Sequence, residues 1–197
     1  MVIGETVASA VKDQLLERGM AMLLQRGYND LGLADLLKEA DVPKGSFYHH
    51  FRSKEDFGVQ VVDRYMREVH AGLDRCLGNT DVPPLKRVRQ FFELSEEKYR
   101  TEGYLGCLLG GLGQELSGIS EVFRGKVEEC FRQIERRIAA CLEEAVRQRE
   151  LDQDADPKKL AHLLINCWEG AALRSRMLRD PAPLREMLDF YFRCAAR

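Results

Sequence analysis

The sequence predicts an all-α protein of about nine helices, because apolar residues recur at three- and four-residue spacings along most of the chain. No run of alternating apolar and polar residues is long enough to predict a strand. Pro is scarce, with 6 residues, whereas helix-favouring Leu, Arg, Glu and Ala are abundant. Hydrophobic residues make up 45% and charged residues 31% of the 197 residues, which is typical of a folded globular chain. A chain of this length can bury a sufficient core without disulfides or metals.

The first four helices can be bounded by their caps and breakers. Gly27 ends the first helix, and Pro43 separates the two short helices that follow. Ser53, with Asp56 three residues later, resembles a capping box and begins a long helix. The segment 78–84, rich in Gly, Asn and Pro, is the clearest loop. The predicted ranges are 6–25, 33–40, 44–50 and 54–77.

Five more helices are predicted in the second half of the chain. One begins at Leu85 and ends before Gly103, and a Gly-rich helix comes next. Ser120 begins a long helix that lasts until an Asp-rich break. Asp156 and Asp180, each followed by Pro, combine an N-cap with a first-turn Pro. The predicted ranges are 85–102, 105–116, 121–150, 157–178 and 182–195.

Composition excludes several classes of protein. The 30 Lys and Arg against 32 Asp and Glu give a net charge of -2, which argues against non-specific coating of nucleic acid. No stretch has the ~18 apolar residues of a membrane span, and the N-terminus is a poor signal peptide. The six Cys form no CxxC pair and have no zinc-site spacing to His, so we expect reduced thiols in the cytoplasm, and no metal or cofactor.

Residues 31–55 predict two short helices joined by a tight turn, an arrangement that presents the second helix to the major groove of DNA. Between Asp41 and Glu55 the only formal charges are three cations, Lys44, Arg52 and Lys54. Hydrogen-bonding side chains of the kind that reach phosphates and base edges lie among them. They are Ser46, Tyr48, His49 and His50, while Phe47 and Phe51 would anchor the helix to the core. The pattern alone does not separate this arrangement from a helical hairpin with a solvated face.

VPKGSFYHHFRSKEDF, together with the preceding LLERGMAMLLQRGYNDLGLADLLKEADV, resembles the signature of the TetR family of transcriptional repressors. The resemblance implies an all-α homodimer that binds a palindromic double-stranded operator. It implies a helix-turn-helix DNA-binding domain over residues 1–52 and a ligand-binding and dimerisation domain over residues 53–197. Position by position, it assigns DNA contacts to Lys44, Gly45, Ser46, Tyr48, His49 and Lys54.

Two positions depart from the family pattern. Leu31 and Gly32 stand where the family often has a Thr before the second helix, so that helix needs another cap. Asp41 stands in the turn where Gly is common, and we expect it to adopt the left-handed backbone conformation at some cost.

A second resemblance concerns the Gly-rich helix. GCLLGGLGQE at residues 106–115, with WEGA at 168–171 and LR at 173–174, is similar to a TetR branch that senses electrophiles, oxidants or small unsaturated acids. In its redox-sensing members the Cys of this segment, here Cys107, is the reactive one. Arg174 or Arg176 would supply a cation that lowers the pKa of the thiol. Arg176 stands where such relatives use a Lys, which argues against an amine-linked switch. The alternative is that Cys107 is simply a small buried hydrophobe.

The remaining candidates concern the ligand pocket and the dimer. Trp168 either lines the pocket or fills the core, and Gln114 and Glu169 are candidate groups for orienting a ligand. Cys130, Cys141, Cys167 and Cys194 are interpreted as core or interface packing. The last two helices are predicted to pair with their copies through Leu160, Leu164, Cys167, Leu184, Leu188 and Tyr191.

The predicted function is therefore a homodimeric DNA-binding repressor, released from its operator by a small ligand or by modification of Cys107. One alternative is a cytosolic thiol enzyme with Cys107 as nucleophile, although no orienting His lies nearby in the sequence. The other is a helical interaction protein that does not bind DNA.

Overall fold

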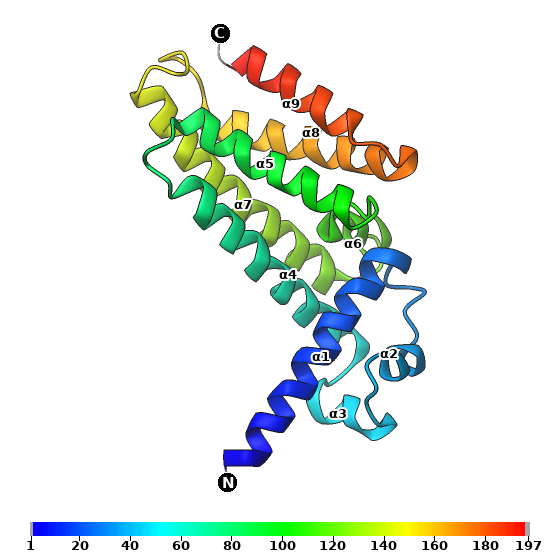
Figure 1. Ribbon diagram of the computed structural model, residues 1–197. Helices are drawn as coiled ribbons and strands as arrows, with labels where there is room; N and C mark the ends of the chain where they lie inside the picture. The colour runs from blue at the N-terminus through cyan, green and yellow to red at the C-terminus, as the bar shows by residue number, and fades with distance from the viewer. Residues whose placement is uncertain (1, 196–197) are drawn as a thin grey trace.

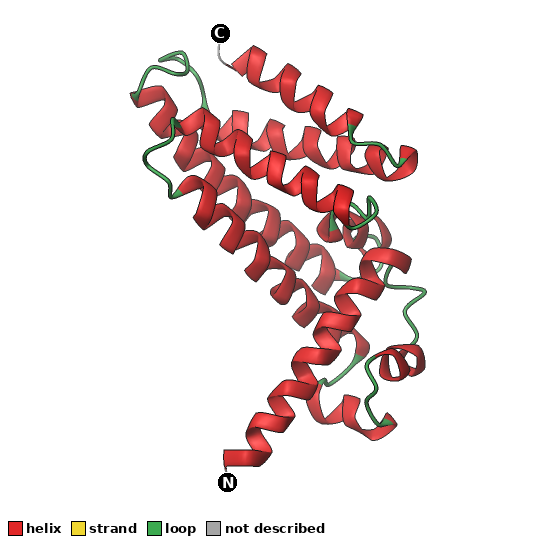
Figure 2. Cartoon of the chain, in the orientation of Figure 1, coloured by secondary structure: helices red, strands yellow, loops and turns green. Residues whose placement is uncertain are grey.

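The computed structural model describes residues 2–195 of the chain, and the side chains of residues 10–43 and 45–194. Within residues 2–195 there are nine α-helices, one short 3-10 helix and no strand, which confirms the predicted all-α class (Figure 2). The N-terminal elements are α1 (Val2–Arg26), α2 (Leu33–Glu39), η1 (Lys44–Ser46) and α3 (Phe47–His50). They are followed by α4 (Lys54–Leu77), α5 (Pro84–Thr101), α6 (Leu108–Leu116), α7 (Glu121–Arg147), α8 (Pro157–Leu178) and α9 (Ala182–Ala195).

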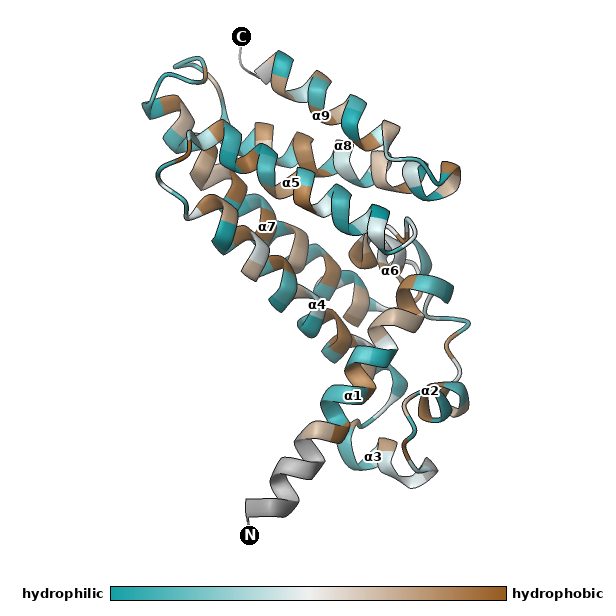
Figure 3. Cartoon of the chain, in the orientation of Figure 1, coloured by the Kyte–Doolittle hydropathy of each residue, from teal (hydrophilic) through white to brown (hydrophobic). Residues whose placement is uncertain are grey.

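The elements form a small head and a larger helical body (Figure 1). In the head, α2 packs against α1, and α4, which also packs against α1, leads from the head into the body. The central helix of the body is α7, which packs against α4, α5, α6 and α8, while α9 covers α8 and part of α5. Figure 3 shows apolar residues interleaved with polar ones along these helices, as expected for amphipathic helices that share one core.

Helix starts follow the predicted caps. The Oγ atom of Ser53 accepts a hydrogen bond from the N–H of Asp56 at 3.0 Å, and Ser120 accepts one from Phe123 at 3.2 Å. Asp156 accepts from the N–H groups of Lys158 and Lys159 at 3.1 and 3.2 Å. These side chains satisfy backbone donors that have no partner within the first turn, and so they fix where α4, α7 and α8 begin.

The two departures from the family pattern are tolerated locally. Asp41 has a φ of 50°, so it adopts the left-handed conformation expected of it. Gly32 is the N-cap of α2, and no side chain caps that helix. The turn between α2 and η1 therefore keeps its path without Gly, and α2 begins without a capping hydroxyl.

The Gly-rich helix begins later than predicted. Residues 105–107, which we expected to be helical, are extended or turn-like, and α6 starts only at Leu108. The cause is a run of left-handed backbone, with φ of 80° at Gly103, 61° at Tyr104 and 80° at Gly106. Cys107 is consequently the N-cap of α6, with φ -88° and ψ 127°, and not a residue within a helix.

Candidate functional site

The head presents one face of η1 and α3 to solvent because the other face is anchored by aromatic rings. Phe47 and Phe51 are fully buried, and their ring centroids lie 5.0 Å apart. Both rings pack on Phe57 of α4, at 5.5 and 4.9 Å between centroids. This cluster confirms the anchoring role expected of Phe47 and Phe51, and it fixes the direction in which the remaining side chains of α3 point.

The exposed face carries most of the side chains assigned to DNA. Tyr48 is 68% exposed, His49 is also exposed, and Ser46 is half-buried. Gly45 faces open space, with nothing within 4 Å of a Cβ built there. The side chain of Lys44 lies outside the described residues. Gly45 of η1 and the exposed ring of Tyr48 on α3 form a surface that a DNA backbone or groove can approach closely.

Lys54, the last of the assigned DNA contacts, lies at the junction between head and body. Its Nζ atom stands 4.6 Å from the ring centroid of Tyr28, a cation–π distance. Burial lowers the pKa of Lys54, while the carboxylates of Glu115 and Asp30 raise it. The half-buried ammonium group therefore faces the end of α6 as well as the head, and its contact with DNA stays a prediction.

Glu115, to which the sequence pattern assigned no role, fastens the body to the head. Its carboxylate accepts hydrogen bonds from the N–H of Tyr28 at 3.0 and 3.2 Å and from the N–H of Asn29 at 3.0 Å. Gly27, with φ 83°, makes room for it, because a Cβ at that position would overlap the carboxylate. The only signal in the sequence was the place of Glu115 at the end of the Gly-rich segment.

A small cavity of about 50 Å³ lies among α4, α5, α6, α7 and α8. Tyr65 of α4, Tyr99 of α5 and Trp168 of α8 line it, and each is at most 8% exposed. The ring of Trp168 stands 5.8 Å from that of Tyr99 and 4.8 Å from that of Phe92. Trp168 therefore both lines the cavity and fills the core, so the two interpretations of this residue coincide.

Cys107 lies in the wall of this cavity. The hydroxyl of Tyr65 donates a hydrogen bond to the Sγ atom at 3.7 Å. Burial raises the pKa of the Cys107 thiol, and the neighbouring carboxylate of Glu169 raises it further. The expected lowering of the thiol pKa by Arg174 or Arg176 is therefore wrong. Arg174 is exposed and does not line the cavity or its grooves, and Arg176 directs a guanidinium N–H to the carbonyl of Gln25 at 3.4 Å.

Glu169 is the acidic group of the cavity. Its carboxyl group packs against Gly110 of α6, where a Cβ would overlap it. The same Cβ position is 3.8 Å from the Cβ of Cys107, so the carboxyl group of Glu169 and the side chain of Cys107 are neighbours. Burial raises the pKa of Glu169 to about 7. This carboxyl group consequently changes its protonation near neutral pH.

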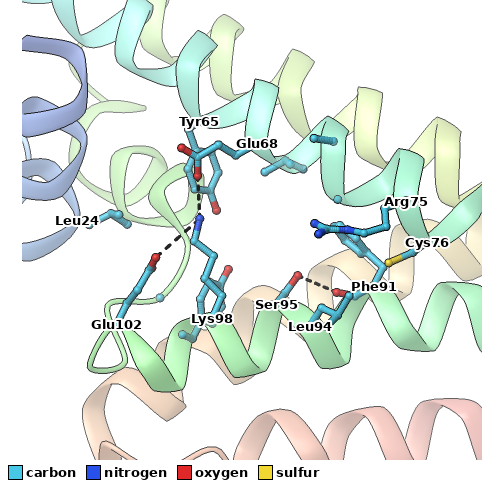
Figure 4. Close-up of a pocket in the computed structure, with 15 residues that line it drawn as sticks. Leu24, Tyr65, Glu68, Arg75, Cys76, Phe91, Leu94, Ser95, Lys98 and Glu102 are labelled. Carbon is cyan, nitrogen blue, oxygen red and sulfur yellow. Dashed lines mark hydrogen bonds and ion pairs between the residues drawn. The ribbon is translucent and has the colours of Figure 1, made fainter. Parts of the chain in front are cut away.

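Two grooves flank the cavity. One, of about 380 Å³, lies between α4 and α5 and is shown in Figure 4. Lys98 crosses it, with its Nζ 2.8 Å from a carboxylate oxygen of Glu68 and 3.8 Å from one of Glu102. The other, of about 450 Å³, lies between α6 and α8 and is lined by Cys107, Glu169 and Arg176, with Gln114 exposed at its rim. Cys107 therefore lines both the small cavity and the groove between α6 and α8.

Most of the predicted dimer residues are buried within the single chain. Leu164, Leu184, Leu188 and Tyr191 are at most 6% exposed within the single chain, where they hold α8 and α9 together. Leu160 and Cys167 are half-buried, and the Leu160 carbonyl accepts a hydrogen bond from Tyr191 at 2.8 Å. The apolar side chains that these two helices leave exposed are Leu163, Leu173, Met177, Leu178 and Phe190. The main apolar stripes of α8 and α9 therefore pack within the protomer.

The remaining cysteines and histidines form no further site in the described part of the chain. Cys76, Cys130 and Cys141 are buried, Cys194 is exposed, and all six thiols are free. No group of three or more potential metal ligands occurs among the described residues. None of the described helices is long and apolar enough to cross a membrane.

Comparison with known proteins identifies the class. Residues 15–59 match the family model described as "Bacterial regulatory proteins, tetR family", and residues 84–191 match "Tetracyclin repressor-like, C-terminal domain". The "Transcriptional regulator AcuR" of Cereibacter sphaeroides is 37% identical over 182 residues, which cover 92% of this chain and 83% of that protein. The "HTH-type transcriptional repressor NemR" of Escherichia coli K12 is 33% identical over 178 residues, covering 90% and 89%.

Solved structures agree. The regulatory protein TetR from Rhodobacter sphaeroides has a TM-score of 0.88 at 36% identity, covering 92% of this chain and 96% of that one. The reduced form of E. coli NemR has a TM-score of 0.82 at 32% identity, covering 92% and 95%. The chain belongs to the TetR family. It is a helix-turn-helix transcriptional regulator and not an enzyme, which sets aside the thiol-enzyme and adaptor alternatives.

Proposed function

We propose that this regulator is a homodimeric repressor that releases its operator when a small electrophile or ligand occupies the site around Cys107. The observation that carries this proposal is the position of α6. Its N-cap, Cys107, lies in the wall of the cavity, and its last turn carries Glu115, which holds Tyr28 and Asn29 of the head. A change at the thiol therefore acts on a single short helix that is fastened to the DNA-binding head.

A second connection supports the same coupling. The long helix α4 begins in the head at Lys54 and carries Tyr65, whose hydroxyl contacts the thiol of Cys107. DNA favours the dimer state in which the two heads are spaced by one helical turn, ~34–36 Å. An inducer that binds another state more tightly weakens DNA binding by its differential affinity for the two states.

The DNA-binding surface we propose is the face of η1 and α3 with the start of α4. It comprises Lys44, Gly45, Ser46, Tyr48, His49 and Lys54. Exposure of Tyr48 and the open space at Gly45 support this assignment. The operator is a palindromic double-stranded DNA in the bacterial cytoplasm, because a two-fold dimer presents two identical heads. The domain boundary we propose lies at residues 52 and 53, where α3 has ended and α4 begins.

The dimer we propose pairs α8 and α9 with their copies through the side chains that they leave exposed. Leu163, Leu173 and Met177 are exposed on α8, and Phe190 of α9 is 65% exposed. Phe190→Glu places two like charges in a self-complementary interface and should yield a folded monomer at micromolar concentration by light scattering. Leu188→Glu, which charges the core of the protomer, should instead lose the fold. A Phe190→Glu protein that stays dimeric would place the interface elsewhere.

The decisive experiment for the repressor itself is a gel shift on the promoter next to its own gene, with and without acrolein. The parent protein should bind and then release the DNA, whereas Cys107→Ser should bind and no longer release it. Release that persists in Cys107→Ser would mean a non-covalent inducer in the same cavity. Absence of binding by either protein would overturn the choice of this promoter as the operator.

A further inference from the structure

We propose that Glu169 is the general base for Cys107. The sensor thiol then reacts as a neutral thiol, and Glu169 removes its proton while the sulfur adds to an electrophile. This inference rests on the proposed function of Cys107. The geometry that carries it is the absence of a side chain at Gly110, which leaves room for the Glu169 carboxyl group beside Cys107 in the wall of the same cavity. The guanidinium group of Arg176 is not placed to stabilise a thiolate at Cys107, because it reaches toward the Gln25 carbonyl at the end of α1.

The reaction balances with a small, neutral α,β-unsaturated carbonyl compound. The Sγ atom forms a bond to the β-carbon, and the C=C electron pair moves to give an enolate. The thiol proton passes to the Glu169 carboxylate, which then delivers it to the α-carbon, so the product is a saturated thioether and the carboxylate is restored. No oxidant or second reactant is needed. The Tyr99 hydroxyl group, which lines the same cavity, is a donor for the carbonyl oxygen, whereas the Tyr65 hydroxyl donates to the sulfur in this structure.

The surroundings leave Glu169 as the one base adjacent to the thiol in the described structure. Toward the cavity, the titratable groups of α4 and α5 are the phenols of Tyr65 and Tyr99, beside the hydroxyl of Ser95, and α7 contributes apolar side chains. Burial, with the nearby thiol, raises the pKa of both phenols well above the usual range, so they remain neutral donors. On the side of the groove between α6 and α8, the charged groups are Arg26 of α1, Glu115 of α6, and Arg176 and Arg179 at the end of α8.

Protonation near neutrality suits Glu169 to this role. A pKa raised by burial makes the carboxylate a stronger base than an ordinary glutamate, while it is still ionised in a useful fraction of molecules at neutral pH. The high pKa of the thiol means that free thiolate contributes little. The site therefore holds Cys107 unreactive toward weak reagents, yet allows proton removal when an electrophile is in place.

The test is the pH dependence of Cys107 alkylation by acrylamide, followed by peptide mass. In the parent protein the rate should rise to about pH 7 and then level off, because it follows ionisation of Glu169. Glu169→Gln should lower the rate at about pH 7.5 by at least tenfold and should replace the plateau by a continuous rise of about tenfold per pH unit. Glu143→Gln, an exposed carboxylate of α7, is the control for the change of charge.

Two results would overturn the general-base role of Glu169. If the carboxylate only suppresses thiolate formation, Glu169→Gln will react faster than the parent at neutral pH, and the general-base role is overturned. An unchanged rate and profile would overturn it as well. Alkylation rates are measured without DNA, so they test the role of Glu169 independently of the gel shift. Either proposal can therefore fail while the other stands.

A second variant avoids removing the charge. Gly110→Ala introduces a methyl group that displaces the Glu169 carboxyl group from the thiol, without backbone strain, since the φ of Gly110 is not positive. It should lose the plateau in the same way as Glu169→Gln. Gly111→Ala, which lines the same groove but meets nothing within 4 Å, is the matched control and should keep the plateau. A Gly110→Ala protein that retains the plateau would contradict the proposed contact.

Discussion

The face of α3 and the cavity around Cys107 use similar side chains in opposite surroundings. Tyr48 on α3 is 68% exposed, and its ring rests edge-on against Phe47. Tyr65 in the cavity is 8% exposed, and burial together with Cys107 raises its pKa well above the usual range. On the face of α3 a side chain offers its shape and its hydrogen-bonding groups to solvent. In the cavity the neighbouring groups determine the pKa of a side chain. The two regions should therefore respond to substitution in different measurements.

The largest difference is expected in stability. Trp168→Ala should lower the free energy of unfolding by about 3–5 kcal/mol, because Trp168 fills the space between Phe92 and Tyr99 and its removal leaves a hole. Urea denaturation at a fixed protein concentration measures this change. A loss below about 1 kcal/mol would mean that the cavity collapses readily, and the contrast between a rigid cavity and an open surface would be wrong.

A pH-dependent difference in stability comes next. An acid whose pKa is about 7 when folded and 4.5 otherwise binds more protons in the folded state between these values. Its contribution to stability is therefore lost as the pH rises from about 4.5 to about 7. Glu169→Gln removes that loss, so it should stabilise the protein by up to about 3 kcal/mol at pH 8 and hardly at all at pH 4. Thermal or urea unfolding at the two pH values, with Glu143→Gln as control, checks the sign.

The head should show a moderate effect on affinity alone. Tyr48→Ala should weaken operator binding about tenfold, near 1.4 kcal/mol, while it changes the free energy of unfolding by less than about 0.5 kcal/mol. Quantitative gel shifts and urea denaturation give the two numbers. Tyr48→Phe, which keeps the ring, separates the contribution of the hydroxyl. If Tyr48→Ala is instead strongly destabilising, Tyr48 belongs to the core of the head and not to its contact surface.

The smallest expected effect concerns Lys54, which stands between the two regions. If its ammonium group neutralises one phosphate, Lys54→Gln should reduce the slope of log affinity against log salt by about 0.9. Lys158→Gln, an exposed lysine at the start of α8, should leave the slope unchanged. An unchanged slope in Lys54→Gln would assign this lysine to the junction with Tyr28 and Glu115 alone.

Most helix boundaries could be predicted from local signals, because capping side chains and left-handed residues act within one turn. Ser53, Ser120 and Asp156 begin helices as predicted, and Asp41 adopts its left-handed turn. The start of α6 was misplaced because Tyr104, a residue that usually avoids positive φ, extends the break before the helix. The local sequence pattern does not predict a positive φ at a tyrosine.

The candidate site was predictable only in part, since its chemistry depends on contacts between distant segments. Cys107 and Trp168 could be singled out by resemblance, but the neighbours that decide the pKa of the thiol lie on other helices. The apolar stripes of α8 and α9 predicted burial correctly, but a stripe does not distinguish the interior of a protomer from a partner's surface. Leu188, predicted at the dimer interface, is buried within the single chain, and its interface role stays a prediction. Glu115 was missed because its partners are backbone N–H groups of a turn 86 and 87 residues away.

The fit between Gly27 and Glu115 restricts how this protein can be recombined with its relatives. A chimera that takes its DNA-reading head from another regulator transplants the end of α1, and any side chain at position 27 would collide with the carboxylate that holds the graft in place. The positive φ at Gly27 adds a backbone requirement at the same joint. Hybrid sensors built on this body should therefore carry glycine at that position, or exchange residue 115 together with the head.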